Sequence, residues 1–251
     1  MNGAIHAIVL AAGRGSRLGR LGEDTPKWLL DVGGRTIADR QLEGIALARD
    51  HVASTRVVTG HGADAIDRFL ASRDDEPPVE TVFNPEYATL NNWYSLLVGL
   101  RSLPDDGGPI AVLNADLHLD PAWVAGFLRD AAGASSGAML AVDLERNLTD
   151  ESMKVSLRAD GTLERIGKVG VEDPAGEYIG MLSAGGDVLR RLRAALEDWV
   201  GDAGAVDQWY EGAVLLTAQG GAPWHVWPTP GTGWIEIDDD ADLDAAVGLA
   251  R

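Results

Sequence analysis

Short apolar runs alternate with amphipathic segments along the first half of the chain. The runs predict buried strands, whereas apolar residues at three- and four-residue spacing predict helices. The expected strands are residues 4–13, 54–60, 79–84 and 109–116. The expected helices are residues 36–50, 63–72, 91–103 and 120–131. Because strands that alternate with helices form parallel sheets, the pattern predicts an α/β, Rossmann-like fold with helices on both faces.

The alternation loosens after about residue 137. Further strands are expected at residues 137–144, 154–167, 177–184, 224–227 and 234–237, with a hairpin turn at ADGT inside the second segment. Helices are expected at residues 185–200, near 207–218 and in the acidic segment that follows the last strand. We therefore expect one domain over residues 1–251, with a mixed, mostly parallel sheet and a more mixed C-terminal half.

The composition narrows the possible partners of this fold. A net charge of −18, from 21 basic and 39 acidic residues, argues against nucleic-acid binding through a broad basic face. No run of apolar residues is long enough for a membrane span, and the N-terminal segment lacks the pattern of a secretory signal. The absence of cysteine excludes disulfides and thiolate chemistry and favours a cytoplasmic location. An anionic ligand therefore needs a local cluster of positive groups or a metal ion.

The loop after the first expected strand supplies such a cluster. Ligands of open α/β sheets bind beyond the carboxyl ends of the strands, where this loop lies. Gly13 and Gly15 allow close approach of the backbone to a phosphate, and Arg14, Arg17 and Lys27 supply charge.

Two familiar phosphate-binding motifs do not fit this loop. The dinucleotide fingerprint requires glycine where Leu18 stands and a helix where Pro26 follows, and the Walker sequence is absent. For GRGSR alone, a surface loop with scattered arginines is the simpler interpretation.

Longer stretches of the sequence carry more information. LAAGRGSRLG is followed by PKWLL and VGGRTIADRQL, and further along by FNPEYATLNNWYSLL, LNAD and WIEIDDDADLDAA. Together these motifs resemble the nucleotidyltransferases that activate phosphorylated small molecules, in particular the phosphocholine cytidylyltransferase-like branch. The resemblance spans residues 5–247 in family order and is loose over residues 143–230.

The resemblance implies a reaction that joins a phosphate or phosphonate to the α-phosphorus of an NTP and releases pyrophosphate. CTP is the favoured nucleotide and Mg²⁺ the expected cofactor. Because the attacking oxygen is already anionic, the step needs two anions held in line and neutralised rather than a strong base. The expected catalytic residues are Arg17, Lys27 and Asp116. Expected nucleotide contacts are those three residues and Leu10, Ala11, Ala12, Gly13, Gly15, Asn91, Asn92 and Ser95, the last three bordering the base unless they only cap a helix.

The expected metal ligands are carboxylates. Asp116 ends an apolar strand, and Asp120 before Pro121 suits the helix cap, which leaves Asp116 free. Glu236 and Asp238 alternate along WIEID and so point to one face. By resemblance they complete the site, and the sequence does not rank them. A turn position and a solvated strand edge are the alternative interpretations.

The acceptor is expected to contact Lys154 and Lys168 through its phosphate and VDQWYEG through its head group. In that segment Trp209, Tyr210 and Glu211 offer aromatic faces and a carboxylate to a cation such as choline or a primary amine. The alternatives are ordinary surface lysines and a helix that buries its aromatic residues.

The resemblance divides the chain into a nucleotide-binding half, residues 1–136, and an acceptor-binding half, residues 137–251, which also completes the metal site. Expected partners are an NTP and a small phosphorylated or phosphonate acceptor, without nucleic acid or membrane. Two other functions stay open: a sugar-1-phosphate or inositol-phosphate nucleotidyltransferase, and a nucleotide-sensing module without catalysis. The oligomeric state is open as well.

Overall fold

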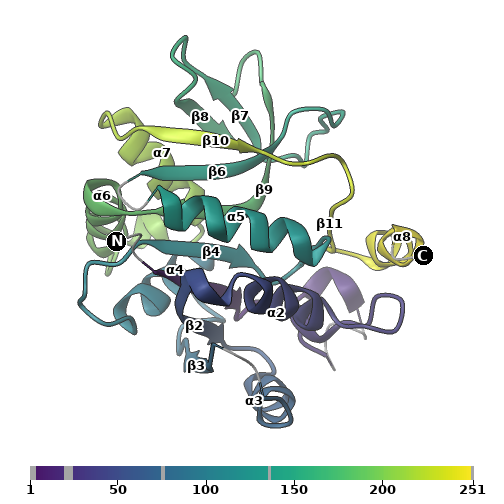
Figure 1. Ribbon diagram of the computed structural model, residues 1–251. Coiled ribbons are helices and arrows are strands. Elements are labelled where there is room, and N and C mark those ends of the chain that lie inside the picture. Colours follow the sequence, from purple (N-terminus) through teal and green to yellow (C-terminus); the bar gives the residue numbers. More distant parts are fainter. Residues whose placement is uncertain (1–3, 20–24, 75–76, 135–136, 250–251) are drawn as a thin grey trace.

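A nine-stranded mixed sheet organises the chain. The computed structural model describes residues 4–19, 25–74, 77–134 and 137–249 (Figure 1). The sheet has the order β10-β6-β9-β4-β1-β2-β3, and β7 and β8 extend it beside β9. Its strands are β1 (Ile5–Ala11), β2 (Val52–Thr59), β3 (Val79–Phe83), β4 (Ile110–Asn114), β6 (Ala138–Asp143), β7 (Lys154–Leu157), β8 (Leu163–Gly167), β9 (Gly176–Ala184) and β10 (Trp224–Pro228).

Strands β1 to β4 pair in parallel, as do β10 and β6, whereas β9 runs antiparallel to both β4 and β6. The predicted α/β, Rossmann-like class with a mixed, mostly parallel sheet is therefore confirmed, and strands from both halves of the chain share the sheet.

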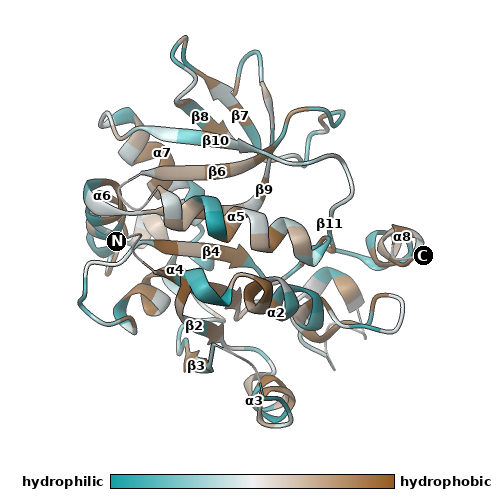
Figure 2. Ribbon diagram, in the orientation of Figure 1, coloured by the Kyte–Doolittle hydropathy of each residue, from teal (hydrophilic) through white to brown (hydrophobic). Residues whose placement is uncertain are grey.

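Helices cover both faces of the sheet (Figure 1). They are α2 (Ile37–Leu47), α3 (Ala63–Ala71), α4 (Asn92–Arg101), α5 (Pro121–Gly133), α6 (Gly186–Asp198), α7 (Tyr210–Gln219) and α8 (Asp240–Leu249). Val9 of β1 packs in the core with α2 and α5, whereas its neighbours Ile8 and Leu10 pack in the core with α4, α6 and α7. This two-residue alternation is the strand geometry that the apolar runs predict. Figure 2 shows β4 hydrophobic along its length between these layers.

The helix starts follow the sequence signals. Thr36 caps α2 and forms a capping box with Asp39. Asp120 caps α5 by accepting a hydrogen bond from the backbone N–H of Ala122 at 2.8 Å, as predicted. Because Asp120 takes the capping role, Asp116 is available for another one.

A second, two-stranded sheet was not foreseen in this form. β5 (Leu117–His118) pairs antiparallel with β11 (Ile235–Glu236), so the expected strand at 234–237 is only two residues long. Two short 3₁₀ turns, Ser16–Leu18 and Lys27–Leu29, lie between β1 and α2. None of the described helices is long and apolar enough to cross a membrane.

Candidate active site

The loop beyond β1 brings two cations to the carboxyl end of the sheet. Gly15 has a φ of 60°, a left-handed conformation that favours glycine, and a Cβ there would lie 3.2 Å from Cγ of Lys27. Leu18 and Trp28 are buried and anchor the two short turns that carry Arg17 and Lys27. The backbone that carries Arg17 and Lys27 is thus held against the core.

Three carboxylates from distant parts of the sequence converge beside these cations. One oxygen from each of Asp116, Glu236 and Asp238 lies within 4.8 Å of the others. Asp116 follows β4, and its carbonyl accepts a hydrogen bond from the backbone N–H of Ile237 at 2.9 Å. The β5–β11 ladder therefore carries Glu236 and Asp238 to Asp116, and the predicted carboxylate set comes together.

Lys27 and Arg17 partly neutralise this cluster. Lys27 Nζ lies 2.5 Å from Asp238 Oδ1 and 3.3 Å from Asp116 Oδ2, and Arg17 lies 2.9 Å from Asp238 Oδ2. Burial lowers the pKa of Lys27, but the charges of Asp116 and Asp238 outweigh it, so that the pKa of Lys27 is raised. The ammonium therefore stays charged at neutral pH.

The remaining electrostatics fit a divalent cation. Burial, followed by the charges of Asp116 and Asp238, raises the pKa of Glu236, although its side chain keeps surface open to the pocket. Asp116 Oδ1 is buried and has no hydrogen-bond partner among the described residues. An unpartnered carboxylate oxygen among like charges is costly unless a cation meets it. Because all three residues offer hard oxygen ligands, the set suits Mg²⁺.

A pocket of about 470 Å³ opens beside the cluster. Of the predicted nucleotide contacts it is lined by Leu10, Ala12, Gly13, Gly15, Arg17, Lys27, Asn91, Asn92, Ser95 and Asp116. Ala11 does not line it and borders a small cavity of about 40 Å³ with Trp28 instead. The pocket is large enough for a nucleotide and has basic groups at the end that carries the carboxylates.

The asparagines at the start of α4 connect the two halves of the chain. The side chain of Asn91 accepts from Asn92 N as a helix cap and donates to the carbonyl of Asp207 at 3.2 Å. Asn92 Oδ1 accepts from the backbone N–H of Tyr210 at 3.0 Å, and Ser95 Oγ accepts from Asn84 at 3.0 Å. The residues thus form a helix cap, as the simpler interpretation predicts, and also line the pocket, whereas contact with the base stays a prediction.

A second pocket of about 320 Å³ adjoins the first and shares Arg17, Glu236 and Asp238 with it. Lys168 lines this pocket, lies 2.8 Å from Glu151 Oε2 and stands 5.3 Å from the ring centroid of Trp209. Lys154 does not line either pocket, because its ammonium donates to the carbonyl of Lys168 at 3.0 Å. Lys154 thus supports the position of Lys168.

The three residues expected to bind a head group lie in different environments. Trp209 lines the first pocket and is 40% exposed. The expectation that the Tyr210 ring faces the head group is wrong, because the side chain is fully buried. Its hydroxyl donates to Asn114 Oδ1 and forms a hydrogen bond with the hydroxyl of Tyr178. Its ring is held in the core, as the alternative interpretation of an aromatic-burying helix predicts.

Glu211 is buried and lines neither pocket, and its Oε2 has no hydrogen-bond partner among the described residues. Burial, aided by the charge of Asp116 and opposed by that of Lys168, raises the pKa of Glu211 to about 7. A buried carboxylate with a pKa near neutrality is typical of functional sites.

Sequence reasoning missed most of the residues that line the second pocket, among them Arg146, Glu177 and Trp234. Arg146 stacks 4.4 Å from the ring centroid of Trp234 and lies 3.8 Å from Glu177. Arg146 and Glu177 come from the loosely matching region, where no motif marked them. Trp234 directly precedes the acidic strand, and this position is the signal from which its place at the site could have been predicted.

This fold and site are typical of proteins that bind a nucleoside triphosphate at the end of a Rossmann-like sheet, with or without catalysis. Residues 7–211 match the family described as the MobA-like NTP transferase domain, and the chain belongs to that family. The resemblance inferred from the motifs is thereby confirmed.

Individual relatives match different shares of the chain. It is 29% identical over 245 residues to CMP-5'-(3-aminopropyl)phosphonate synthase of Streptomyces rubellomurinus (strain ATCC 31215), an alignment that covers 95% of this chain and 37% of the relative. It is 32% identical over 113 residues to choline-phosphate cytidylyltransferase of Streptococcus pneumoniae (strain ATCC BAA-255 / R6), covering 45% of each. The chain thus matches less than half the length of either relative.

Solved structures show the same fold. CTP:phosphocholine cytidylyltransferase from Streptococcus pneumoniae superposes with a TM-score of 0.80 at 21% identity, over 99% of this chain and 100% of that one. The inositol-1-phosphate CTP transferase from T. maritima gives a TM-score of 0.74 at 18% identity, over 98% of this chain and 95% of that one.

Proposed function

We propose that the chain is a Mg²⁺-dependent cytidylyltransferase that joins CTP to a small aminoalkyl phosphonate or phosphocholine-like acceptor and releases pyrophosphate. The observation that carries the proposal is the carboxylate cluster of Asp116, Glu236 and Asp238 at the boundary between two adjoining pockets. An ion held there adjoins both a nucleotide in the first pocket and an acceptor in the second, which an in-line transfer requires. Membership of the NTP transferase family supports the reaction class.

The cations at the cluster provide a way to receive the triphosphate. Lys27 and Arg17 now face Asp238, and two nucleotide phosphates offer them stronger anionic partners. Mg²⁺, when bound by the carboxylates, supplies charge neutralisation at the α-phosphate. Lys27 and Arg17 then hold the triphosphate and stabilise the charge that develops on pyrophosphate.

The lining of the second pocket suits a zwitterionic acceptor. Its cations Arg17, Arg146 and Lys168 each already face a carboxylate, so the pocket offers both signs of charge. The phosphonate would meet these cations. The amine would meet the ring of Trp209, which lines the first pocket 5.3 Å from the ammonium of Lys168, so that the acceptor would extend across the boundary between the two pockets. The buried Glu211 carboxylate, on which the charge of Lys168 acts, would attract the same amine. In this arrangement residues 1–136 bind the nucleotide and residues 137–251 bind the acceptor.

Two relatives favour cytidine and an amine. The names of the Streptomyces and Streptococcus relatives specify CMP transfer to 3-aminopropylphosphonate and choline phosphate. Asn91, Asn92 and Ser95 line the end of the pocket assigned here to the base, and asparagine can both donate and accept.

A pyrophosphate-release assay tests the proposal. CTP, UTP, GTP, ATP and dTTP are each combined with phosphocholine, 2-aminoethylphosphonate, 2-hydroxyethylphosphonate, glucose 1-phosphate and inositol 1-phosphate. We expect CTP with a cationic phosphonate or phosphate ester to give the highest kcat/KM. Preference for a sugar or inositol phosphate would assign the chain to the other transferase class, and nucleotide binding without turnover in every pair would assign it to a sensing role.

A further inference from the structure

Gln41 is a buried amide with an unusual set of partners. It lies on α2, and its side chain is fully buried. Its Nε2 donates to the carbonyl oxygens of Asn114 at 2.9 Å and Leu117 at 3.0 Å, and its Oε1 accepts from the indole N–H of Trp28 at 3.0 Å. Both hydrogens and the oxygen of the amide are therefore used.

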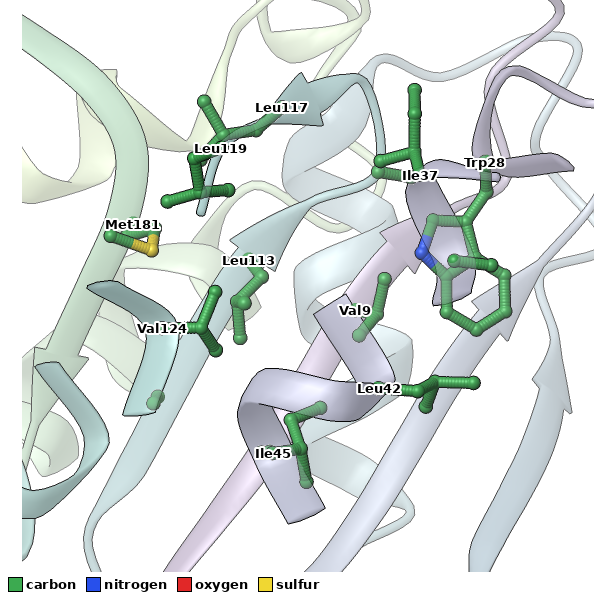
Figure 3. Close-up of a cluster of buried hydrophobic side chains, with 14 of the residues drawn as sticks. Val9, Trp28, Ile37, Leu42, Ile45, Leu113, Leu117, Leu119, Val124 and Met181 are labelled. Atoms are coloured by element: carbon green, nitrogen blue, oxygen red, sulfur yellow. The ribbon is translucent and has the colours of Figure 1, made fainter. Parts of the chain in front are cut away.

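These partners are close in sequence to two residues of the candidate site, Asp116 and Lys27. Asn114 and Leu117 lie on either side of Asp116, and Trp28 directly follows Lys27. Figure 3 shows Val9, Ile37 and Leu42 beside the Trp28 ring, which is fully buried, so the packed core restrains the indole that reaches Gln41. One amide thus connects the turn that holds a metal ligand to the turn that holds the phosphate-binding lysine.

We propose that Gln41 is a positioning residue that sets the distance between Lys27 and Asp116 for nucleotidyl transfer, an inference that rests on the proposed function. The two side chains approach to 3.3 Å between Nζ and Oδ2, yet they come from separate turns beyond β1 and β4. Displacement of such groups by about 1 Å can cost about 100-fold in rate. A hydrogen-bonded link through the core restrains both turns against the same helix, whereas apolar contacts alone resist sliding less.

A purely structural role is the competing explanation, because a buried amide also satisfies two buried carbonyls. The two roles differ in what a variant changes. Loss of a structural hydrogen bond lowers only the free energy of unfolding. Loss of a positioning link also lowers kcat and weakens metal binding, because the ligand oxygen of Asp116 is no longer held in place.

The experiment compares Trp28→Phe and Gln41→Met with the control Trp224→Phe. Trp28→Phe removes the N–H and keeps a smaller aromatic ring, and the control loses the same atoms, which makes it the better matched test if Gln41→Met folds poorly. Trp224 is also fully buried, and its indole N–H donates to Thr217 Oγ1 at 2.9 Å in the core on the other face of the sheet. Each protein is measured for unfolding in urea, for kcat and KM with CTP, and for Mn²⁺ binding without nucleotide by electron paramagnetic resonance.

We expect Trp28→Phe and Gln41→Met to lower kcat by about 10-fold and to weaken Mn²⁺ binding by a similar factor. We expect the double variant to be no worse than Gln41→Met alone, since both changes break one link. Trp224→Phe should lose comparable stability and keep kcat within about twofold of wild type.

The inference is overturned if Trp28→Phe and Gln41→Met lose stability like the control but retain wild-type kcat and Mn²⁺ binding. It is also overturned if the wild-type protein binds no Mn²⁺. Failure of the proposed function has a different signature: wild-type protein that binds Mn²⁺ but transfers no nucleotide, in which case the Mn²⁺ titration of the variants still decides the role of Gln41.

Discussion

Glu211→Gln tests whether a buried carboxylate is retained for binding at the expense of stability. Burial raises the pKa of Glu211 from 4.5 to about 7 in the folded protein. The groups that act on it are Asp116, which raises its pKa, and Tyr210 and Lys168, which lower it. Because the folded pKa lies above the unfolded one, the contribution of Glu211 to stability is complete below about pH 4.5 and is lost as pH rises through about 7.

The size of this effect follows from the pKa. A rise from 4.5 to about 7 corresponds to about 3.4 kcal/mol in all, since one pKa unit is about 1.4 kcal/mol. About 2.5 kcal/mol of it falls between about pH 5 and about pH 8. Glutamine does not ionise, so the free energy of unfolding of Glu211→Gln minus that of wild type should rise by about 2.5 kcal/mol over this range.

Urea unfolding followed by circular dichroism at about pH 5 and about pH 8 measures the difference. Glu164→Gln, at an exposed carboxylate of β8, controls for the removal of a surface charge. An equal stability difference at both pH values would refute the reasoning, because it would show that the pKa of Glu211 is not raised by burial.

Glu211→Gln should also change the activity toward an acceptor that carries an amine. If the Glu211 carboxylate attracts the acceptor amine, kcat/KM of wild type for 2-aminoethylphosphonate should rise with pH through about 7, where Glu211 ionises. Glu211→Gln should lower that kcat/KM by about 10-fold or more, the worth of a charged hydrogen bond, and should remove this rise. Loss of the same size for 2-hydroxyethylphosphonate would show that Glu211 does not recognise the amine.

Three further predictions concern the other site residues. Asp116→Asn should keep the fold but lower kcat by about 100-fold or more, because it removes an anionic ligand worth several kcal/mol; wild-type turnover at limiting Mg²⁺ would exclude Asp116 as a ligand. Lys27→Ala should lower kcat by about 100-fold and weaken CTP binding, whereas the exposed Arg14, which stacks on Tyr87, should tolerate alanine within about twofold; equal steady-state losses would contradict this order. Trp209→Leu should raise KM for phosphocholine by about 5-fold and leave that for 2-hydroxyethylphosphonate unchanged, and a parallel change in both would show that Trp209 only packs.

The features that the sequence predicted correctly have strong local signals. β1 is buried at every position and apolar at all but His6, and the Thr36 capping box marks the start of α2. The convergence of the three carboxylates was expected from the family motifs that contain them. Asp116 and Asp238 lie far apart in sequence, and only the family resemblance joined them before the structure placed them within reach of Lys27.

Other features have no local signal. β5 is two residues long, too short for any periodicity, yet it carries Glu236 to the site. Trp209 and Tyr210 are neighbours with similar side chains, but α7 begins between them, and this separates an exposed ring from a buried one. Arg146 lies in the loop between β6 and β7, which carries no periodic pattern, so its place in the second pocket required the three-dimensional structure.

The position of β9 has a consequence for synthesis of the chain on the ribosome. β9 lies between β4 and β6 and hydrogen-bonds to both, although β4 is made long before it. Until residues 176–184 have emerged, β4 has an open edge that contains Val112 and Leu113, and such edges pair with other chains. The nascent N-terminal half therefore passes through an aggregation-prone interval that ends when β9 inserts, and slow elongation across residues 137–184 would lengthen that interval.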